Sequence, residues 1–315
     1  MNNSSEKKDN NDKDVWIIWQ KQHFLFTEFK KANYTIFDPF IGCNKIVPRF
    51  FRVIHFSLKI PFKSIWYREL PHNKPTLIVI REGIITEDYL RWLRKRIGDT
   101  QVIVIFMNKI TRNSEVELAK RYNCEVDTGD PLDATLYGMS SSHSAVYLRH
   151  LIIRKEKPLY DVFYAGSAKP GRIKVLDEVC NMLTLSGLTI KKYITSPYPY
   201  GITFGKYMKK MSYANLLNEM RDTRAILHLK EGASTGITMR VVESVINEIK
   251  LITNDASIAD TPIYNSENVF ILGKDDLGGI NDFLDRPFVS IDPKIIESFY
   301  FETWVERDFI TKKID

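Results

Sequence analysis

The chain has 315 residues, of which 44% are hydrophobic and 27% charged, a composition that excludes a largely disordered or fibrous protein. Its length predicts two domains of ordinary size. No uncharged apolar run approaches the roughly 18 residues of a membrane span, and the N-terminus lacks a signal-peptide layout, so we expect a cytoplasmic protein.

The net charge of +6 indicates an anionic partner, which can be nucleic acid, lipid headgroups or phosphorylated metabolites. The three cysteines, Cys43, Cys124 and Cys180, lie far apart in the chain. Their spacing matches neither a zinc site nor a disulfide framework, so we expect reduced, structural thiols.

Residues 1–14 have no apolar residue after Met1 and are expected to form a disordered tail. The first domain, residues 15–154, begins with β-branched runs of strand length, and the stretch between two of them has helical spacing. The strands are expected at Val15–Trp19, Thr76–Ile80 and Val102–Phe106, and the helix at Thr86–Arg96. This alternation is typical of a parallel α/β sheet covered by helices on both faces.

Residues 45–68 combine cations with large apolar side chains, and no acid occurs between Asp38 and Glu69. On a helix, one face would carry Arg49, Arg52 and His55, and the opposite face Phe50, Val53 and Ile54. Such a helix suits the surface of an anionic membrane leaflet. A solvated basic face over an ordinary core is the other interpretation.

A second domain, residues 158–291, repeats the alternation after a charged joint near Arg154–Pro158. Strands are expected at Asp161–Ala165, Thr189–Ile194, Ala225–Leu229, Leu251–Thr253 and Val269–Leu272, and helical segments at Ile173–Ser186, Tyr207–Arg221 and Thr238–Glu248. Residues 292–315 are expected to form one last helix, capped by Asp292 and Pro293. Its apolar stripe either covers the second domain or crosses back to the first.

Two loops after predicted strands have the residues of a phosphate site, because open parallel sheets bind ligands at the carboxyl ends of their strands. In the first loop, Gly166 and Ser167 allow close backbone approach, and Lys169 and Arg172 can neutralise a diphosphate near a helix start. A basic loop of this kind is also common without a ligand.

The second loop gives a more specific signal, since a small, hydroxyl-rich turn leads into the helix Thr238–Glu248. Its hydroxyls can cap the first-turn amides or share them with phosphate; they belong to Ser234, Thr235 and Thr238. Arg240 and Glu243 lie on one helix face beside the apolar stripe, where both can reach a ligand and where truncation should cost little stability. An ordinary surface ion pair is the alternative.

The stretches FYAGSAKPGR, STGITMRVVE, KLITND and NVFILGKDD, between Tyr160 and Pro287, resemble the C-terminal domain of bacterial GT-B glycosyltransferases that build lipopolysaccharide, capsule or other surface glycans. The resemblance implies two Rossmann-like domains facing a central cleft. By position, Glu243 would hold the donor ribose, and Arg240, Thr238, Lys169 and Arg172 its phosphates. The family's E-x7-E spacing is broken at Thr235, where Glu231 is a possible substitute.

We expect no metal and no cofactor beyond the nucleotide-sugar donor, because the one Asp-x-Asp triplet, Asp12–Asp14, lies in the tail. An inverting reaction needs a general base in the first domain. The candidates are Glu82 after the second strand, and Asp127 and Asp130 after the strand Cys124–Val126. Carboxylates at strand ends also serve as helix caps, and a retaining reaction stays open.

The sequence therefore predicts a metal-independent glycosyltransferase that transfers a sugar to a glycan or lipid-linked glycan acceptor for bacterial surface polysaccharide. It would be cytoplasmic and either soluble or peripheral on the membrane through residues 45–68. A basic nucleic-acid-binding protein without catalytic activity is the alternative, although no nucleic acid is expected, since the second domain gathers hydroxyls and one ion pair rather than a run of cations. A dehydrogenase is disfavoured because no G-x-G-x-x-G follows a predicted strand.

Overall fold

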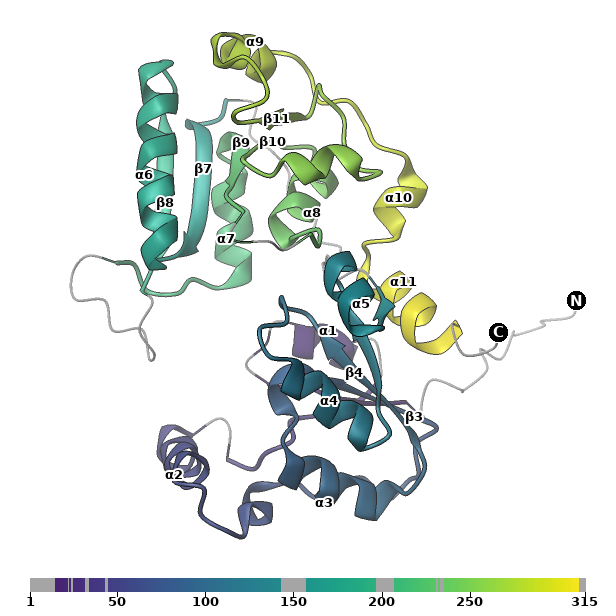
Figure 1. Ribbon diagram of the computed structural model, residues 1–315. Helices are drawn as coiled ribbons and strands as arrows, with labels where there is room; N and C mark the ends of the chain where they lie inside the picture. The colour runs from purple at the N-terminus through teal and green to yellow at the C-terminus, as the bar shows by residue number, and fades with distance from the viewer. Residues whose placement is uncertain are drawn as a thin grey trace, which may run out of the picture. The chain divides into compact units, whose positions relative to one another are not determined.

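The chain folds into two compact units, residues 1–144 and 145–315, each built on one parallel sheet (Figure 1). The expected tail, and most of the expected joint at Arg154–Pro158, lie outside the described residues. The computed structural model describes residues 15–21, 23, 25–31, 34–42, 45–142, 157–196, 207–230, 232 and 235–311. None of the described helices is both long and apolar enough to cross a bilayer.

The first sheet has the order β2-β1-β3-β4-β5-β6, and each neighbouring pair of strands is parallel. The strands predicted near residues 15, 76 and 102 are confirmed within one or two residues. The pattern did not indicate β2 and β6, which have only three and two residues. The strands are β1 (Val15–Ile18), β2 (Thr35–Phe37), β3 (Leu77–Arg81), β4 (Gln101–Phe106), β5 (Glu125–Thr128) and β6 (Ser140–Ser141).

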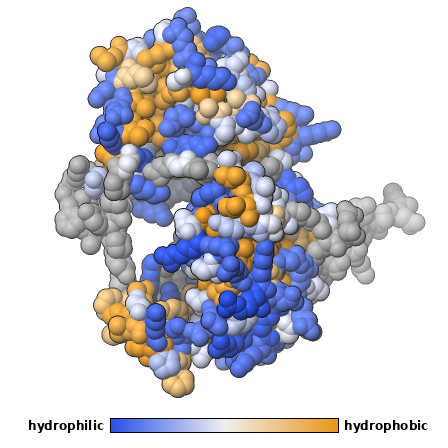
Figure 2. All heavy atoms as spheres, in the orientation of Figure 1, coloured by the Kyte–Doolittle hydropathy of each residue, from blue (hydrophilic) through white to orange (hydrophobic). Residues whose placement is uncertain are grey.

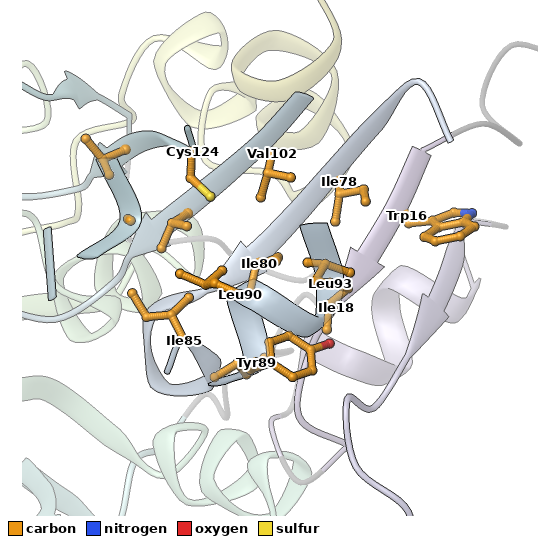
Figure 3. Packing of buried hydrophobic residues seen from close by; sticks show 14 of the residues in the cluster. Trp16, Ile18, Ile78, Ile80, Ile85, Tyr89, Leu90, Leu93, Val102 and Cys124 are labelled. Atoms are coloured by element: carbon orange, nitrogen blue, oxygen red, sulfur yellow. The ribbon is translucent and has the colours of Figure 1, made fainter. Parts of the chain in front are cut away.

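Helix α3 (Glu87–Ile97) forms because its ends and its apolar spacing agree. The Thr86 hydroxyl accepts a hydrogen bond from the Tyr89 amide at 3.2 Å, and acidic residues in the first turn and basic residues in the last turn complement the helix dipole. Its buried face packs on β3 and β4 (Figure 3). The other helices of this unit are α1 (Leu25–Lys31), α2 (Ile46–Ser57), α4 (Asn113–Arg121) and α5 (Pro131–Tyr137).

The second sheet has the order β11-β10-β9-β7-β8 and is also parallel throughout. All five strands were predicted from their apolar runs, and the fold class, α/β with two Rossmann-like domains, is confirmed. The strands are β7 (Tyr160–Ser167), β8 (Ile190–Thr195), β9 (Thr223–His228), β10 (Lys250–Thr253) and β11 (Val269–Ile271).

Helices cover both faces of this sheet. On one face, α6 (Pro170–Leu185) and α9 (Ile280–Asp285) pack against Val162 and Ala225, and on the other face α7 (Tyr213–Met220) and α8 (Met239–Ile246) pack against Phe163 and Ile226. Alternate residues of β7 and β9 therefore enter separate cores, as expected for a sheet buried on both faces.

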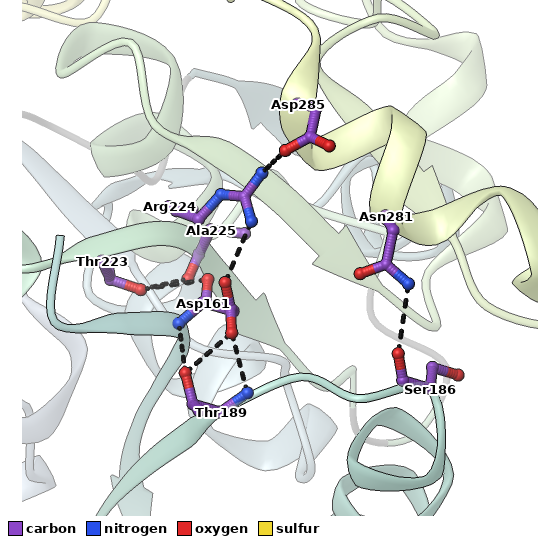
Figure 4. A network of polar contacts seen from close by, with 8 residues as sticks. All are labelled: Asp161, Ser186, Thr189, Thr223, Arg224, Ala225, Asn281 and Asp285. Carbon is purple, nitrogen blue, oxygen red and sulfur yellow. Dashed lines mark hydrogen bonds and ion pairs between the residues drawn. The ribbon is translucent and has the colours of Figure 1, made fainter. Parts of the chain in front are cut away.

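A polar network closes the edge of the second sheet where its strands begin (Figure 4). The Asp161 carboxylate accepts hydrogen bonds from the Thr189 amide at 2.8 Å and from Arg224 at 3.0 Å, and Arg224 also pairs with Asp285 of α9. These contacts join the beginnings of β7, β8 and β9. The loops with the predicted ligand residues lie at the opposite edge.

The C-terminal segment differs from the single helix expected over residues 292–315. Asp292 caps the Lys294 amide at 2.9 Å and Pro293 begins a helix, as predicted. The chain then forms α10 (Pro293–Glu297), α11 (Phe301–Val305) and a π-helical turn, η7 (Glu306–Ile310). Extended backbone at Tyr300 separates the two helices, because Phe299 and Tyr300 pack into the core beside α8. Tertiary packing thus outweighs the helical periodicity.

Candidate functional site

At the centre of the second sheet, β7 and β9 are neighbours, although β8 lies between them in the sequence. From β7 it continues outward to β8 on one side, and from β9 it continues to β10 and β11 on the other. Loops that leave two neighbouring strands in opposite directions separate at such a switch point and leave room for a ligand. The two loops singled out in the sequence, after β7 and after β9, both border it.

Gly166 and Ser167, expected in the loop after β7, are the last two residues of the strand itself. A Cβ atom on Gly166 would lie 2.5 Å from the hydroxyl of Tyr164 in the same strand, so a larger residue there would have to displace that side chain. Ser167 ends β7, and Lys169 is the N-cap residue of α6, without a side-chain hydrogen bond to the helix. Arg172 lies in the first turn of α6. The predicted residues of this loop are therefore gathered at the carboxyl edge and the start of α6.

The loop after β9 leads into α8 through Thr238, the N-cap residue. Its Oγ1 is buried and has no hydrogen-bond partner among the described residues, and it does not cap the helix. Such a buried hydroxyl is costly unless a partner is supplied. Thr235 is exposed, whereas Ser234 and the possible substitute Glu231 lie outside the described residues.

Arg240 and Glu243 form an ion pair at the start of α8, as their spacing predicted. The expectation that both lie off the buried stripe is wrong for Glu243, which is 1% exposed. Every residue from Val241 to Ile246 is buried, because other elements cover the polar side of this helix as well. Burial raises the pKa of Glu243, and the charge of Arg240 opposes that rise.

Sequence reasoning missed His228, the last residue of β9. Its Nδ1 lies 3.0 Å from the Thr253 hydroxyl, at the end of the neighbouring strand β10. Burial lowers the pKa of His228 to about 4; Asp255 opposes the shift, and the positive charges of Arg240, Arg172 and Lys230 add to it. The imidazole is therefore neutral near pH 7. Its one sequence signal was a polar residue at the end of an apolar strand.

Lys230 was also missed, and it orders the ends of β9 and β10. Its Nζ donates to Asp255 at 2.7 Å and to the Ser257 hydroxyl at 2.9 Å. Burial raises the pKa of Asp255, but the hydrogen bonds from Lys230 and Ser257 outweigh it and hold that pKa below its usual value. The edge thus carries a fixed cation and a fixed carboxylate.

The positive charges that act on His228 come from both sequence motifs, the loop after β7 and the loop after β9. Arg172 from α6 and Arg240 from α8 both lower the pKa of this one imidazole, so the positive charges of both motifs reach the end of β9. The two motifs lie about 70 residues apart in the sequence, which gave no sign that their arginines act on the same residue.

Among the solved structures that match the chain are two that cover most of its length, whereas no family model and no curated protein matches it. One is a lipopolysaccharide outer core galactosyltransferase, WaaB, in its apo form, at 14% identity and a TM-score of 0.47, covering 93% of this chain and 97% of that one. The other is the spinosyn forosaminyltransferase SpnP, at 10% identity and a TM-score of 0.42, covering 96% and 91%. Both names denote glycosyltransferases.

The three candidate bases lie at the carboxyl edge of the first sheet, and each has a structural partner. Glu82 accepts hydrogen bonds from the Met107 amide at 3.3 Å and from Asn108 at 2.6 Å. Asp127, expected after the strand, lies inside β5, is 4% exposed and accepts from the Ser142 hydroxyl. Asp130 caps the first turn of α5. The contacts of Asp127 and Asp130 are those of structural residues.

The edge of the second sheet, by contrast, has the chemistry of an anion site. Lys169, Arg172 and Arg240 provide positive charge beside two helix starts, where main-chain N–H groups face outward. A diphosphate there could receive charge-assisted hydrogen bonds from guanidinium groups and from the Thr238 hydroxyl.

Proposed function

We propose that this protein is a glycosyltransferase that uses a nucleotide-sugar donor, bound at the carboxyl edge of the second sheet. The observation that carries the proposal is that the starts of α6 and α8 follow the neighbouring strands β7 and β9 at the switch point, where Arg172 and Arg240 both lower the pKa of His228. Nucleotides bind at such points in doubly wound sheets. The family resemblance of the sequence around both loops supports the same conclusion.

In this proposal the donor diphosphate lies between the starts of α6 and α8. Lys169, Arg172 and Arg240 neutralise it, and Thr238 donates its unpartnered hydroxyl hydrogen. When the sugar leaves, negative charge increases on the diphosphate. Once the donor is bound, these cations contact the diphosphate before the sugar leaves and stabilise the new charge, which supports transfer without a metal ion.

Glu243 would accept hydrogen bonds from the ribose hydroxyls, but Arg240 holds its buried carboxylate in the structure described here. We therefore propose that the donor exchanges the partners of this pair. Arg240 turns to the diphosphate, and the ribose hydroxyls replace it at Glu243. The carboxylate then stays partnered in both states, which avoids the cost of a buried unpaired charge.

The acceptor in this proposal is a glycan or a lipid-linked glycan of a bacterial surface polysaccharide, as the resemblance implies. Glu82 is the strongest candidate for a general base in the first unit. It lies directly after β3, and its side chain is 12% exposed, whereas that of Asp130 is 5% exposed. The identity of the base is a proposal that depends on an inverting reaction.

The alternative, a nucleic-acid-binding protein, has less support from the described residues. A phosphate groove needs cations that follow one another along an accessible surface. Here, cations at the second sheet surround one compact edge, and those of residues 45–68 lie among exposed apolar side chains.

Calorimetric titration with a panel of nucleoside diphosphates tests the donor site. We expect at least one of them to bind, and Arg172→Gln and Arg240→Gln each to weaken binding by about 1.5–3 kcal/mol, the contribution of a charge-assisted hydrogen bond. Glu243→Gln should weaken a nucleoside diphosphate more than inorganic diphosphate, because only the nucleoside diphosphate has a ribose for Glu243 to hold.

Lys174→Gln is the matched control, since Lys174 also lies on α6 but its side chain is 83% exposed. It should bind as the wild type does. If no nucleoside diphosphate binds, or if the site variants bind as tightly as this control, the proposed donor site is wrong.

A further inference from the structure

The largest group of exposed apolar side chains in the described part of the chain lies in one short segment. Ten of its seventeen exposed large apolar residues fall between Ile41 and Ile65. Figure 2 shows apolar surface at the lower left, where Figure 1 places α2. Soluble proteins rarely expose apolar groups so close together unless the surface binds something.

Helix α2 turns its apolar side outward. Residues three, four and seven apart lie on one helix face, and here that face carries exposed Val47, Phe50, Phe51 and Ile54, followed by Leu58. The polar side turns toward its own unit: the Arg52 guanidinium lies 4.3 Å from the centre of the Phe40 ring, and His55 accepts the Trp66 indole hydrogen at 3.1 Å. The sequence pattern predicted two faces but not which one would be outside.

The chain after α2 continues this exposed surface. Phe62 is 79% exposed, and its backbone has φ of 65°, a left-handed conformation that is unfavourable for a bulky side chain. Ile60 and Ile65, the latter in the short helix η2 (Lys63–Trp66), are exposed beside it. We call residues 47–65 together with the cavity described next the α2–η2 surface.

A basic cavity of about 460 Å³ opens among these apolar residues. The segment after α2 and helix α3 both line it. Asp88 is the single acid among the described residues that line it, and its neighbour Glu87 pairs with Arg91 at 2.9 Å. Asp88 pairs with Lys63 at 2.6 Å. The cations that line the cavity are Lys59, Lys63, Arg91, Lys95 and Arg96. The contribution of α3 was not visible in the sequence of residues 45–68.

We propose that the α2–η2 surface docks on an anionic lipid bilayer, with its apolar side chains in the headgroup and acyl boundary and lipid phosphates in the basic cavity. Apolar side chains beside several cations match the two layers of a bilayer surface, apolar below and anionic above. A second copy of the chain fits less well, because the same cations would then face one another. The proposal does not depend on the proposed function.

Vesicle co-sedimentation tests the proposal, using phosphatidylcholine vesicles with and without phosphatidylglycerol at low and high salt. The wild type should bind the anionic vesicles at low salt and be released at high salt. Lys59→Gln/Lys95→Gln should weaken that binding roughly tenfold or more, given the attraction of each cation near the surface. Phe50→Ser/Phe51→Ser/Phe62→Ser should bind weakly at either salt concentration.

Control substitutions belong in the second unit, where exposed side chains of the same types lie on α6. Leu185 is 91% exposed, and the side chain of Lys174 is 83% exposed. The variants Leu185→Ser and Lys174→Gln should both bind vesicles as the wild type does. Circular dichroism checks that each variant is folded.

Two outcomes would overturn the proposal. The first is a wild type that stays in the supernatant with anionic vesicles at low salt, or that binds no better than the phenylalanine variant. The second is concentration-dependent dimerisation, measured by sedimentation velocity, that the phenylalanine substitutions abolish while leaving vesicle binding unchanged. That result would assign the surface to a second copy of the chain.

Discussion

His228 is a residue whose role follows from its neighbours. Thr253 orients one ring nitrogen, and burial together with the surrounding cations lowers its pKa to about 4. A neutral imidazole can offer its second nitrogen as a hydrogen-bond donor to a bound anion without adding charge to the site. The lowered pKa could not be predicted from the sequence, because two of the cations that cause it, Arg172 and Arg240, come from α6 and α8.

This lowered pKa predicts how stability depends on pH. Between pH 6.5 and about 4 the unfolded chain binds a proton that the native His228 does not, so the free energy of unfolding should fall as the pH is lowered through this range. The loss should approach about 3 kcal/mol at the lower end. Urea unfolding of the wild type and of His228→Asn, which does not titrate, measures it.

The difference between the two unfolding profiles isolates His228, because Asp255 and the other carboxylates titrate in both proteins. Profiles that stay parallel from pH 7 to pH 4 would show that the histidine is not held neutral in the native state.

At the scale of elements, α8 shows what periodicity can and cannot predict. The stripe of Val241, Val242 and Val245 correctly indicated a helix that packs on the sheet through this face. The pattern could not show that the opposite side is covered too, because that depends on how neighbouring elements pack. The same limit applies to α2, whose apolar face is outside, and to residues 298–300, where packing interrupts the last helix.

The burial of α8 predicts that Glu243→Ala destabilises the protein by about 3–5 kcal/mol, since it leaves Arg240 without its buried partner. Glu178→Ala is the matched control: it breaks a Lys–Glu pair on α6 whose side chains are 83% and 64% exposed, and should cost at most about 1 kcal/mol. Denaturant unfolding compares the two. Equal, small losses would mean that the Arg240–Glu243 pair behaves as a surface pair.

At the scale of the whole molecule, alternating strands and helices were enough to predict two parallel α/β units. They did not predict which strands would be neighbours. The order β8-β7-β9 places the loops after β7 and β9 at the same edge, and only this adjacency gathers the proposed donor residues Lys169, Arg172, Thr238 and Arg240. Local patterns therefore indicated most residues of the candidate site, and the topology of the sheet brings them together.

Metal independence is a prediction about the whole chain, because no Asp-x-Asp occurs outside residues 12–14. If cations of the second unit neutralise the diphosphate, chelation with EDTA should leave the affinity for the best-binding nucleoside diphosphate unchanged. Calorimetric titration with EDTA, and then with added manganese, measures the affinity under both conditions. Binding that EDTA abolishes and manganese restores would overturn the metal-free mechanism.

The position of the first strand within each sheet has a consequence for biosynthesis. β1 pairs with both β2 and β3, and β7 with both β8 and β9, so each unit makes an interior strand first. During synthesis on the ribosome, β1 cannot complete its pairing until β3, which begins at Leu77, has been made. Contacts so distant in sequence slow folding. Fragment design is constrained too: a piece of the second unit that starts after Ser167 loses the middle of its sheet rather than an edge.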